Sequence, residues 1–268
     1  MASSSDPQAV RGFVPPQNDD EKRLMRRVEE LCQTAQSRGI PRYTGFLSDR
    51  EQALATAAMN RVGCCCGRFW GGWAQAERRV LCLEPPDAWQ QEPIAVLHLQ
   101  VPGAVGDGAP AHRDYLGSLL GLGLERACIG DLLLQQGDPA AYVFVLEDKA
   151  EFIAMNLTSA GRFPLHIERC ESAPPELLKP QPRVLSEATV PSLRADTVLA
   201  AMMHTSRTLA AQAITAGRVE VNHIPLRAGH EPVYAQDVFT VRGSGRYRLE
   251  AIGGKSKKDR IFISFYQY

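Results

Sequence analysis

The sequence lacks the segments and residue pairs that mark several common classes of protein. No apolar run reaches the ~18 residues that a membrane-spanning helix requires, and the first 19 residues contain no apolar core of a secretory signal. The seven cysteines include no C-x-x-C pair and the six histidines no H-x-x-x-H pair, the spacings typical of zinc sites. We therefore expect a cytoplasmic chain with reduced thiols and with neither a metal nor another cofactor.

Complete nucleotide-binding and kinase motifs are also missing. Residues 253–256 read GGKS, the end of a P-loop, but the first glycine of that motif would fall at Leu249. Residues 112–114 read HRD, as in a kinase catalytic loop, yet Leu119 occupies the position of the required asparagine and the chain has no D-F-G. We interpret Asp114 as a residue of the first turn of a helix, and we predict no catalytic residue.

The Cys64-Cys65-Cys66 triplet is the one unusual cysteine pattern. Small apolar residues on a strand or at a helix end explain it most simply, and a redox-sensing role is the alternative.

Charge is distributed unevenly along a chain whose formal net charge is zero. Residues 191–268 contain eleven Lys/Arg and six Asp/Glu, a balance of +5, whereas the remainder contains 19 basic and 24 acidic residues, a balance of −5. A basic end on an acidic body indicates a polyanion-binding module attached to other domains.

Apolar periodicity and turn residues predict an α+β chain. Helices are expected over 19–36 and from Ser48, which forms a capping box with Glu51. The predicted parts are a flexible tail (1–18), an N-terminal α+β domain (19–88), a central domain (89–172), a proline-rich linker (173–190) and a C-terminal domain (191–268).

The central domain shows the order βαββαβ of ferredoxin-like and RNA-recognition (RRM-like) folds. Strands are expected at 94–101, 129–135, 141–146 and 164–170, with helices at 112–122 and 149–160. Tyr142 and Phe144 alternate on one strand, but the surrounding AAYVFVLED lacks the RNP1 motif that stacks bases. We favour core packing for these two side chains over RNA contact.

The C-terminal domain is predicted to hold two helices and a small sheet. One helix follows Pro191, and a second begins at the N-cap Ser206 and ends at Gly217. The letters RADTVL (194–199), SRTLA (206–210) and ITAGRVEVN (214–222) resemble the S4 RNA-binding domain, whose pattern is R-L-D-x-x-L, S-R-x-x-A, L-I-x-x-G-x-V-x-V-N.

With FLSDREQ (46–52), HRDYLGSLLGLGLERACIGDLLL (112–134) and the basic run RGSGRYRLEAIGGKSKKDR (242–260), the chain resembles the YlmH family. The resemblance implies an RNA-binding protein of bacterial ribosome-associated quality control, linked to cell division, with ribosomal RNA, peptidyl-tRNA and the large ribosomal subunit as partners. By the match and by charge, the expected RNA-binding residues are Arg194, Ser206, Arg207, Arg218, Asn222, Arg242, Arg246, Arg248, Lys255, Lys257, Lys258 and Arg260.

Two other functions stay open at this point. An RNA-modifying enzyme would use the S4 domain as an anchor, but AGRF (160–163) and AGRV (216–219) lack the aspartate of a pseudouridine synthase. The glycine-rich loop at 101–110 does not belong to the doubly wound sheet of a methyltransferase. A protein-interaction scaffold would instead bind partners through residues 19–172.

Overall fold

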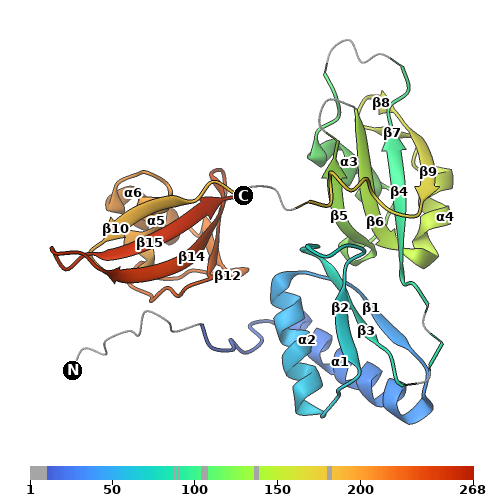
Figure 1. Ribbon diagram of the computed structural model, residues 1–268, viewed down its shortest axis with the longest axis horizontal. Coiled ribbons are helices and arrows are strands. Elements are labelled where there is room, and N and C mark those ends of the chain that lie inside the picture. Colours follow the sequence, from blue (N-terminus) through green and yellow to red (C-terminus); the bar gives the residue numbers. More distant parts are fainter. Residues whose placement is uncertain (1–10, 87, 90, 104–107, 136–138, 180–182) are drawn as a thin grey trace. The chain divides into compact units, whose positions relative to one another are not determined.

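The computed structural model describes residues 11–86, 88–89, 91–103, 108–135, 139–179 and 183–268. The chain forms two compact units (Figure 1), one of residues 15–180 and the other of residues 181–268 together with the first 14 residues. The glycine-rich loop at 101–110 lies partly outside the described residues. Among those residues, the helices are all too short or too polar to cross a membrane.

The first unit begins with an α+β lobe. It contains α1 (Asp19–Arg38), β1 (Arg42–Leu47), α2 (Asp49–Arg61), β2 (Gly67–Trp70) and β3 (Arg79–Leu83), and its antiparallel sheet has the order β1-β3-β2. Residues at helical spacing on α1, from Met25 to Ala35, are buried and join α2 and β3 in one core. The predicted helices are confirmed, whereas β1 and β2 were not foreseen.

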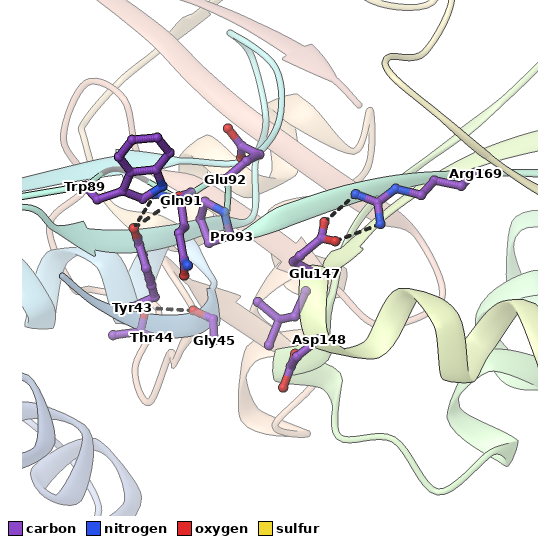
Figure 2. A pocket seen from close by; sticks show the side chains of 11 residues that line it. Tyr43, Thr44, Gly45, Trp89, Gln91, Glu92, Pro93, Glu147, Asp148 and Arg169 are labelled. Carbon is purple, nitrogen blue, oxygen red and sulfur yellow. Dashed lines mark hydrogen bonds and ion pairs between the residues drawn. The ribbon is translucent and has the colours of Figure 1, made fainter.

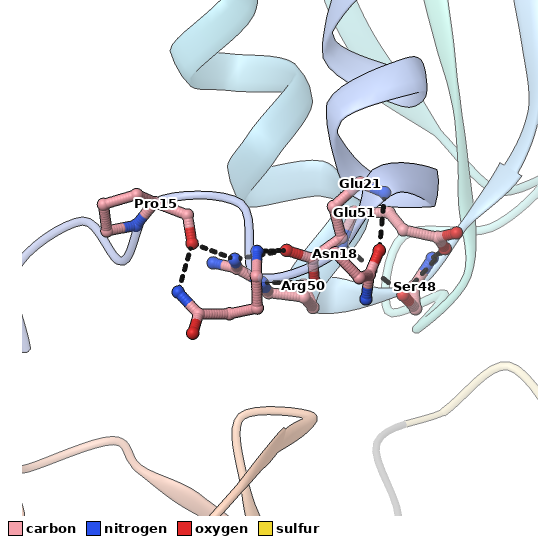
Figure 3. Close-up of polar contacts among 7 residues, drawn as sticks. Pro15, Asn18, Glu21, Ser48, Arg50 and Glu51 are labelled. Atoms are coloured by element: carbon pink, nitrogen blue, oxygen red, sulfur yellow. Dashed lines mark hydrogen bonds and ion pairs between the residues drawn. The ribbon is translucent and has the colours of Figure 1, made fainter.

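Polar contacts fix the starts of both helices (Figure 3). The predicted capping box at Ser48 is present, with the Ser48 backbone N–H donating to Glu51 at 2.7 Å. Arg50 is buried and donates to both carboxylate oxygens of Glu21 at 3.0 and 2.7 Å, and to the carbonyl of Pro15 at 2.9 Å. The end of the predicted flexible tail is therefore held against α1 and α2.

The second lobe of this unit has the predicted RRM-like plan. It contains β4 (Ile94–Gln100), α3 (His112–Gly121), the 3-10 turn η1 (Arg126–Cys128), β5 (Ile129–Leu134), β6 (Ala140–Leu146), α4 (Glu147–Asn156), the short β7 (Ser159–Ala160) and β8 (Phe163–Pro164), and β9 (His166–Cys170). The sheet order β5-β6-β4-β9 is that of the split βαβ fold. The helix α4 ends four residues before the predicted position, because Ser159–Ala160 pairs with Phe163–Pro164 around Gly161 in the left-handed region.

The two faces of this sheet have different neighbours. One face packs on α3 and α4 through Leu97, Val143 and Ile153. On the other face, Phe144 belongs to a cluster with Phe46 and Val80 of the first lobe. The prediction that Phe144 is a core residue is confirmed, since its exposed fraction is 1%. Phe144 is thus not available to stack bases as residues on this face of RRM proteins do, whereas Tyr142 on the same strand is only half-buried.

Polar anchors reinforce the junction between the two lobes. Asp131 on β5 accepts hydrogen bonds from the indole N–H of Trp73 at 3.1 Å and from the backbone N–H groups of Glu77 and Arg78 at 2.8 and 3.1 Å. Burial raises the pKa of Asp131, and these hydrogen bonds oppose the rise. The two lobes are therefore joined both by a common hydrophobic core and by these hydrogen bonds.

The cysteine triplet lies at the end of α2. Cys64 is buried and its Sγ is 3.6 Å from Sγ of Cys66, while Cys65 is exposed. Burial raises the pKa of Cys66, and it raises the pKa of Cys32 to about 12. A raised pKa keeps the Cys66 thiol protonated at neutral pH, which favours the packing interpretation for this residue of the triplet.

The second unit places two helices on a six-stranded sheet (Figure 1). It contains β10 (Ser186–Val190), α5 (Ala195–Met202), α6 (Arg207–Thr215), β11 (Val219–Val221), β12 (Ile224–Pro225), β13 (Val238–Val241), β14 (Gly245–Lys255) and β15 (Ile261–Gln267), in the sheet order β10-β15-β14-β13-β11-β12. Apolar residues of α5 and α6 pack on Phe239, Leu249 and Phe265. The end of the predicted linker forms the edge strand β10, because Ser186–Val190 pairs with β15.

Candidate RNA-binding surface

The start of α6 is built as the sequence predicts. Ser206 is the N-cap, and its hydroxyl accepts from the N–H of Leu209 at 3.2 Å. The preceding turn passes through His204 in the left-handed region, and Gly217 beyond the helix also has positive φ. Arg207 opens the first turn and is exposed. Since the first N–H groups of a helix point outward, Arg207 stands beside the positive end of a helix.

Asp196 joins the two predicted arginines of this region. Its Oδ2 atom lies 2.9 Å from Nη2 of Arg194 and 2.9 Å from Nη2 of Arg207. Thr197 donates its hydroxyl proton to Oδ1 at 3.0 Å. The Asp196 side chain is 6% exposed, whereas those of Arg194 and Arg207 are 41% and 57% exposed. A buried carboxylate therefore holds two guanidinium groups at the surface.

The charged state of Asp196 is secured by its partners. Burial alone would raise its pKa, but the hydrogen bonds from Arg194, Arg207 and Thr197 outweigh that effect and hold the pKa well below its usual range. Sequence reasoning named both arginines but missed Asp196. The aspartate of the R-x-D motif was the available signal, since it lies two residues after Arg194.

Gly229 packs closely against Asp196. Its carbonyl accepts from the Asp196 N–H at 2.9 Å, and a Cβ atom added at Gly229 would lie 2.9 Å from the Asp196 Cβ. The close approach of the two backbones requires a residue without a side chain.

Replacing Gly229 by alanine is expected to lower the free energy of unfolding of this unit by about 1–3 kcal/mol, because the methyl group would displace Asp196. Urea unfolding followed by far-UV circular dichroism measures this change. Gly254→Ala is the matched control, since nothing lies within 4 Å of its added Cβ. Equal stability of the two variants would contradict the prediction.

Asn222 has an internal role. Its backbone is in the left-handed region, its amide donates to Oδ1 of the buried Asp237 at 2.8 Å, and its side-chain oxygen accepts from the N–H of Val238 at 2.9 Å. Asp237 also binds Arg11 through two bonds of 2.9 and 3.0 Å. Both polar ends of Asn222 are thus engaged within the protein, where they fix the turn between β11 and β12.

The basic run 242–260 forms a long hairpin and not a phosphate loop. Its turn is closed by the Ser256 N–H, which donates to the carbonyl of Arg260 at 2.7 Å, and Asp259 adopts positive φ. Lys257 and Lys258 are exposed at the tip. Lys255 lies 2.7 Å from a carboxylate oxygen of Asp259. The GGKS letters therefore mark the end of β14 and the start of a turn.

Arg246 and Arg248 lie further back on β14 and are half-buried. The guanidinium of Arg246 lies 4.5 Å from the ring centroid of Tyr268, a cation–π geometry. Arg248 donates to the side-chain oxygen of Gln236 at 3.1 Å and lies 3.4 Å from a carboxylate oxygen of Glu250. These two arginines are held by neighbours on the sheet.

The structure divides the predicted basic residues between two ends of the sheet. Arg218 and Arg242 meet at one end, where the Arg242 N–H donates to the Arg218 carbonyl at 2.9 Å. The hairpin tip lies at the opposite end of the 11-residue β14, roughly 30 Å away at ~3.3 Å per residue. Arg260 reaches from the tip to the hydroxyl of Thr189 at 3.0 Å, on the strand that leads into α5. The hairpin tip therefore contacts β10, and the arginines held by Asp196 lie on the segments that follow β10 in the chain.

Comparisons with known proteins agree with this geometry. The S4 domain family matches residues 193–238, and the family described as "Putative RNA-binding domain in YlmH" matches residues 108–173. Two helices on a small sheet, with paired arginines at the helix start, define the chain as an S4-type RNA-binding protein.

The full length of the chain gives the narrower assignment. It is 32% identical over 250 residues to the ribosome-associated protein quality control protein P2 of Bacillus subtilis (strain 168), a match that covers 92% of this chain and 95% of that protein. The chain belongs to the YlmH family. A solved structure of the cell division protein ylmH from Streptococcus pneumoniae is similar at a TM-score of 0.45 and 17% identity, covering 59% of this chain and 96% of that one.

Proposed function

We propose that this protein is a non-enzymatic, cytoplasmic RNA-binding factor that docks on ribosomal RNA or tRNA of the bacterial large ribosomal subunit. The docking surface lies on residues 191–268. The observation that carries the proposal is the pair of exposed arginines on the buried Asp196 carboxylate, at the N-terminus of α6. Arginines fixed in place suit recognition of structured RNA, which is read mainly through its backbone and shape.

The contacts with RNA are phosphate contacts made by basic side chains. Ser206 caps the start of α6 through the Leu209 N–H, and Asn222 supports the turn beside Asp237. The phosphate contacts are assigned to Arg194, Arg207, Arg218, Arg242, Arg246, Arg248, Lys255, Lys257, Lys258 and Arg260.

The central lobe takes a positioning role in this proposal. Phe144 on the RRM-like face is covered by the first lobe, so it does not stack on bases. The Bacillus subtilis relative bears the name of a ribosome-associated quality control protein. By that relationship, and by the resemblance to the YlmH family, we assign the protein to subunits that retain peptidyl-tRNA and expect a link to cell division.

Gradient sedimentation of the tagged chain in bacterial lysate tests the proposal. Wild type is expected to travel with the large subunit at low salt and to leave it at high salt, because ion release dominates such binding. Arg207→Ala is expected to stay at the top of the gradient. Lys22→Ala is the control, since Lys22 is an exposed residue of α1 in the other unit. Wild type that stays at the top at every salt concentration would refute ribosome docking.

A further inference from the structure

The unit of residues 15–180 contains a cavity of about 780 Å³ that the RNA-binding proposal does not use (Figure 2). Its volume is in the range of about 300–1,000 Å³ found for ligand sites. The first lobe contributes β1 and the connection from β3 to β4, and the second contributes the start of α4 and one residue of β9. Figure 2 shows Tyr43, Trp89 and Gln91 on one side and Glu147, Asp148 and Arg169 on the other.

The aromatic side presents a ring to solvent. Trp89 is 84% exposed, although tryptophan is usually well buried. Tyr43 is fixed beneath the same connection, because its hydroxyl donates to the carbonyl of Gln91 at 3.1 Å and accepts from the Gln91 N–H at 3.4 Å. An exposed indole beside a fixed phenol offers the π-faces that attract ammonium and guanidinium groups.

The opposite side is acidic. Glu147 accepts two bonds from Arg169 at 2.7 and 2.8 Å, so this pair is neutral. Asp148 supplies a further carboxylate on this side, and Glu92 supplies one on the connection that carries Trp89 (Figure 2). Asp148 contacts Lys149 at 2.9 Å, but its side chain is 69% exposed; such surface pairs contribute little and exchange with an incoming cation. Among the described residues that line the cavity, Arg169 is the only basic one.

The surrounding charge selects the sign of the ligand. Outside residues 191–268 the chain contains 19 basic and 24 acidic residues, so this part of the protein disfavours phosphate groups. Two strands at the cavity, β1 and β9, are each at the edge of their sheets. Edge strands offer backbone hydrogen-bonding groups to an extended peptide. A peptide uses these groups, whereas a free amine has no backbone to pair with them.

We infer that the cavity lined by Tyr43, Trp89, Glu92 and Asp148 is a docking site for an arginine- or lysine-bearing segment of a partner protein. One cationic side chain lies over Trp89 beside Glu92, and a second meets the carboxylate of Asp148 on the other side of the cavity. The site is separate from the RNA-binding surface and does not depend on it.

Fluorescence anisotropy tests this with the full chain and a labelled hexapeptide that carries two arginines. The arginine peptide is expected to bind, and the same peptide with citrulline, the neutral isostere, to bind at least tenfold more weakly. Trp89→Ala is expected to weaken binding about three- to fivefold, as for a cation–π contact at an exposed site. Asp148→Lys is expected to weaken it about tenfold by charge reversal.

Controls separate the site from general electrostatics and from misfolding. Asp20→Lys reverses an acidic residue that is 89% exposed on α1 and is expected to bind like wild type. Circular dichroism verifies that each variant is folded. Arg207→Ala is expected to bind the peptide normally, so failure of the RNA proposal would not affect this result.

Three results would overturn the inference. Equal binding of the arginine and citrulline peptides would show that charge is not recognised. Spermidine that binds as tightly as the peptide would identify a site for free amines. Short single-stranded RNA whose binding is lost in Trp89→Ala would identify a base-stacking site.

Discussion

Replacing Arg50 by leucine is expected to lower the free energy of unfolding of residues 15–180 by about 3–5 kcal/mol, the typical cost of breaking a buried ion pair. Arg50 is 7% exposed and its partner Glu21 is 14% exposed. Without the guanidinium, the Glu21 carboxylate and the Pro15 carbonyl lose a buried donor. All three tryptophans (Trp70, Trp73 and Trp89) lie in this unit, so urea unfolding followed by tryptophan fluorescence reports on it alone.

A second variant distinguishes the loss of the ion pair from the loss of side-chain volume. Arg50→Leu combined with Glu21→Gln removes both charges and is expected to recover at least about 1 kcal/mol. A double variant as unstable as Arg50→Leu would show that packing, not the unpaired carboxylate, causes the loss.

The same pair predicts a pH dependence. The hydrogen bond from Arg50 lowers the pKa of Glu21, with a smaller contribution from the Gln17 N–H and with burial acting in the opposite direction. Because the pKa is lower in the folded state, the pair stabilises fully above the ordinary glutamate pKa of about 4.3, and this stabilisation is lost as pH falls through the folded value. The difference between wild type and the double variant is therefore expected to shrink below about pH 4.

Removing the three lysines of the hairpin tip is expected to weaken binding to isolated large subunits about 10²-fold at 100 mM salt. Each phosphate contact contributes about 0.7–0.9 to the slope of log affinity against log salt, so Lys255→Ala, Lys257→Ala and Lys258→Ala together reduce the slope by about two to three. Pelleting assays between 50 and 200 mM KCl measure both quantities.

The chain supplies a matched control for this experiment. Lys22, Lys149 and Lys179 are the other three lysines of the sequence, and they lie in the acidic unit. Their replacement by alanine removes the same charge from a different place and is expected to leave the slope unchanged. Two triple variants with equal slopes would show that net charge, and not the hairpin tip, determines binding.

Sequence alone predicted those elements that local signals specify. The capping box at Ser48, the N-cap at Ser206 and the left-handed Gly217 are short-range patterns, and all three are confirmed. The strand β10 was missed because Ser186–Val190 carries a weak local signal and becomes a strand through pairing with β15, more than 70 residues away in the chain.

The candidate site residues also divide into those that local signals identify and those that depend on tertiary contacts. Charge identified the arginines, but a list of cations does not reveal which of them share a carboxylate. The link from Arg194 to Arg207 runs through Asp196, which the sequence analysis had not selected. Burial of Phe144 against the first lobe also depends on packing between lobes, which no local pattern encodes.

The pairing of β10 with β15 determines where the RNA-binding end of this protein can be separated from the rest. A fragment that begins at Pro191 would lack the strand along β15, and Ile261–Gln267 would become an open, largely apolar edge. Open edges of this kind recruit other chains and aggregate. An isolated, autonomously folding fragment should therefore begin before Arg183, whose guanidinium also lies over the ring of Tyr266 at 4.6 Å.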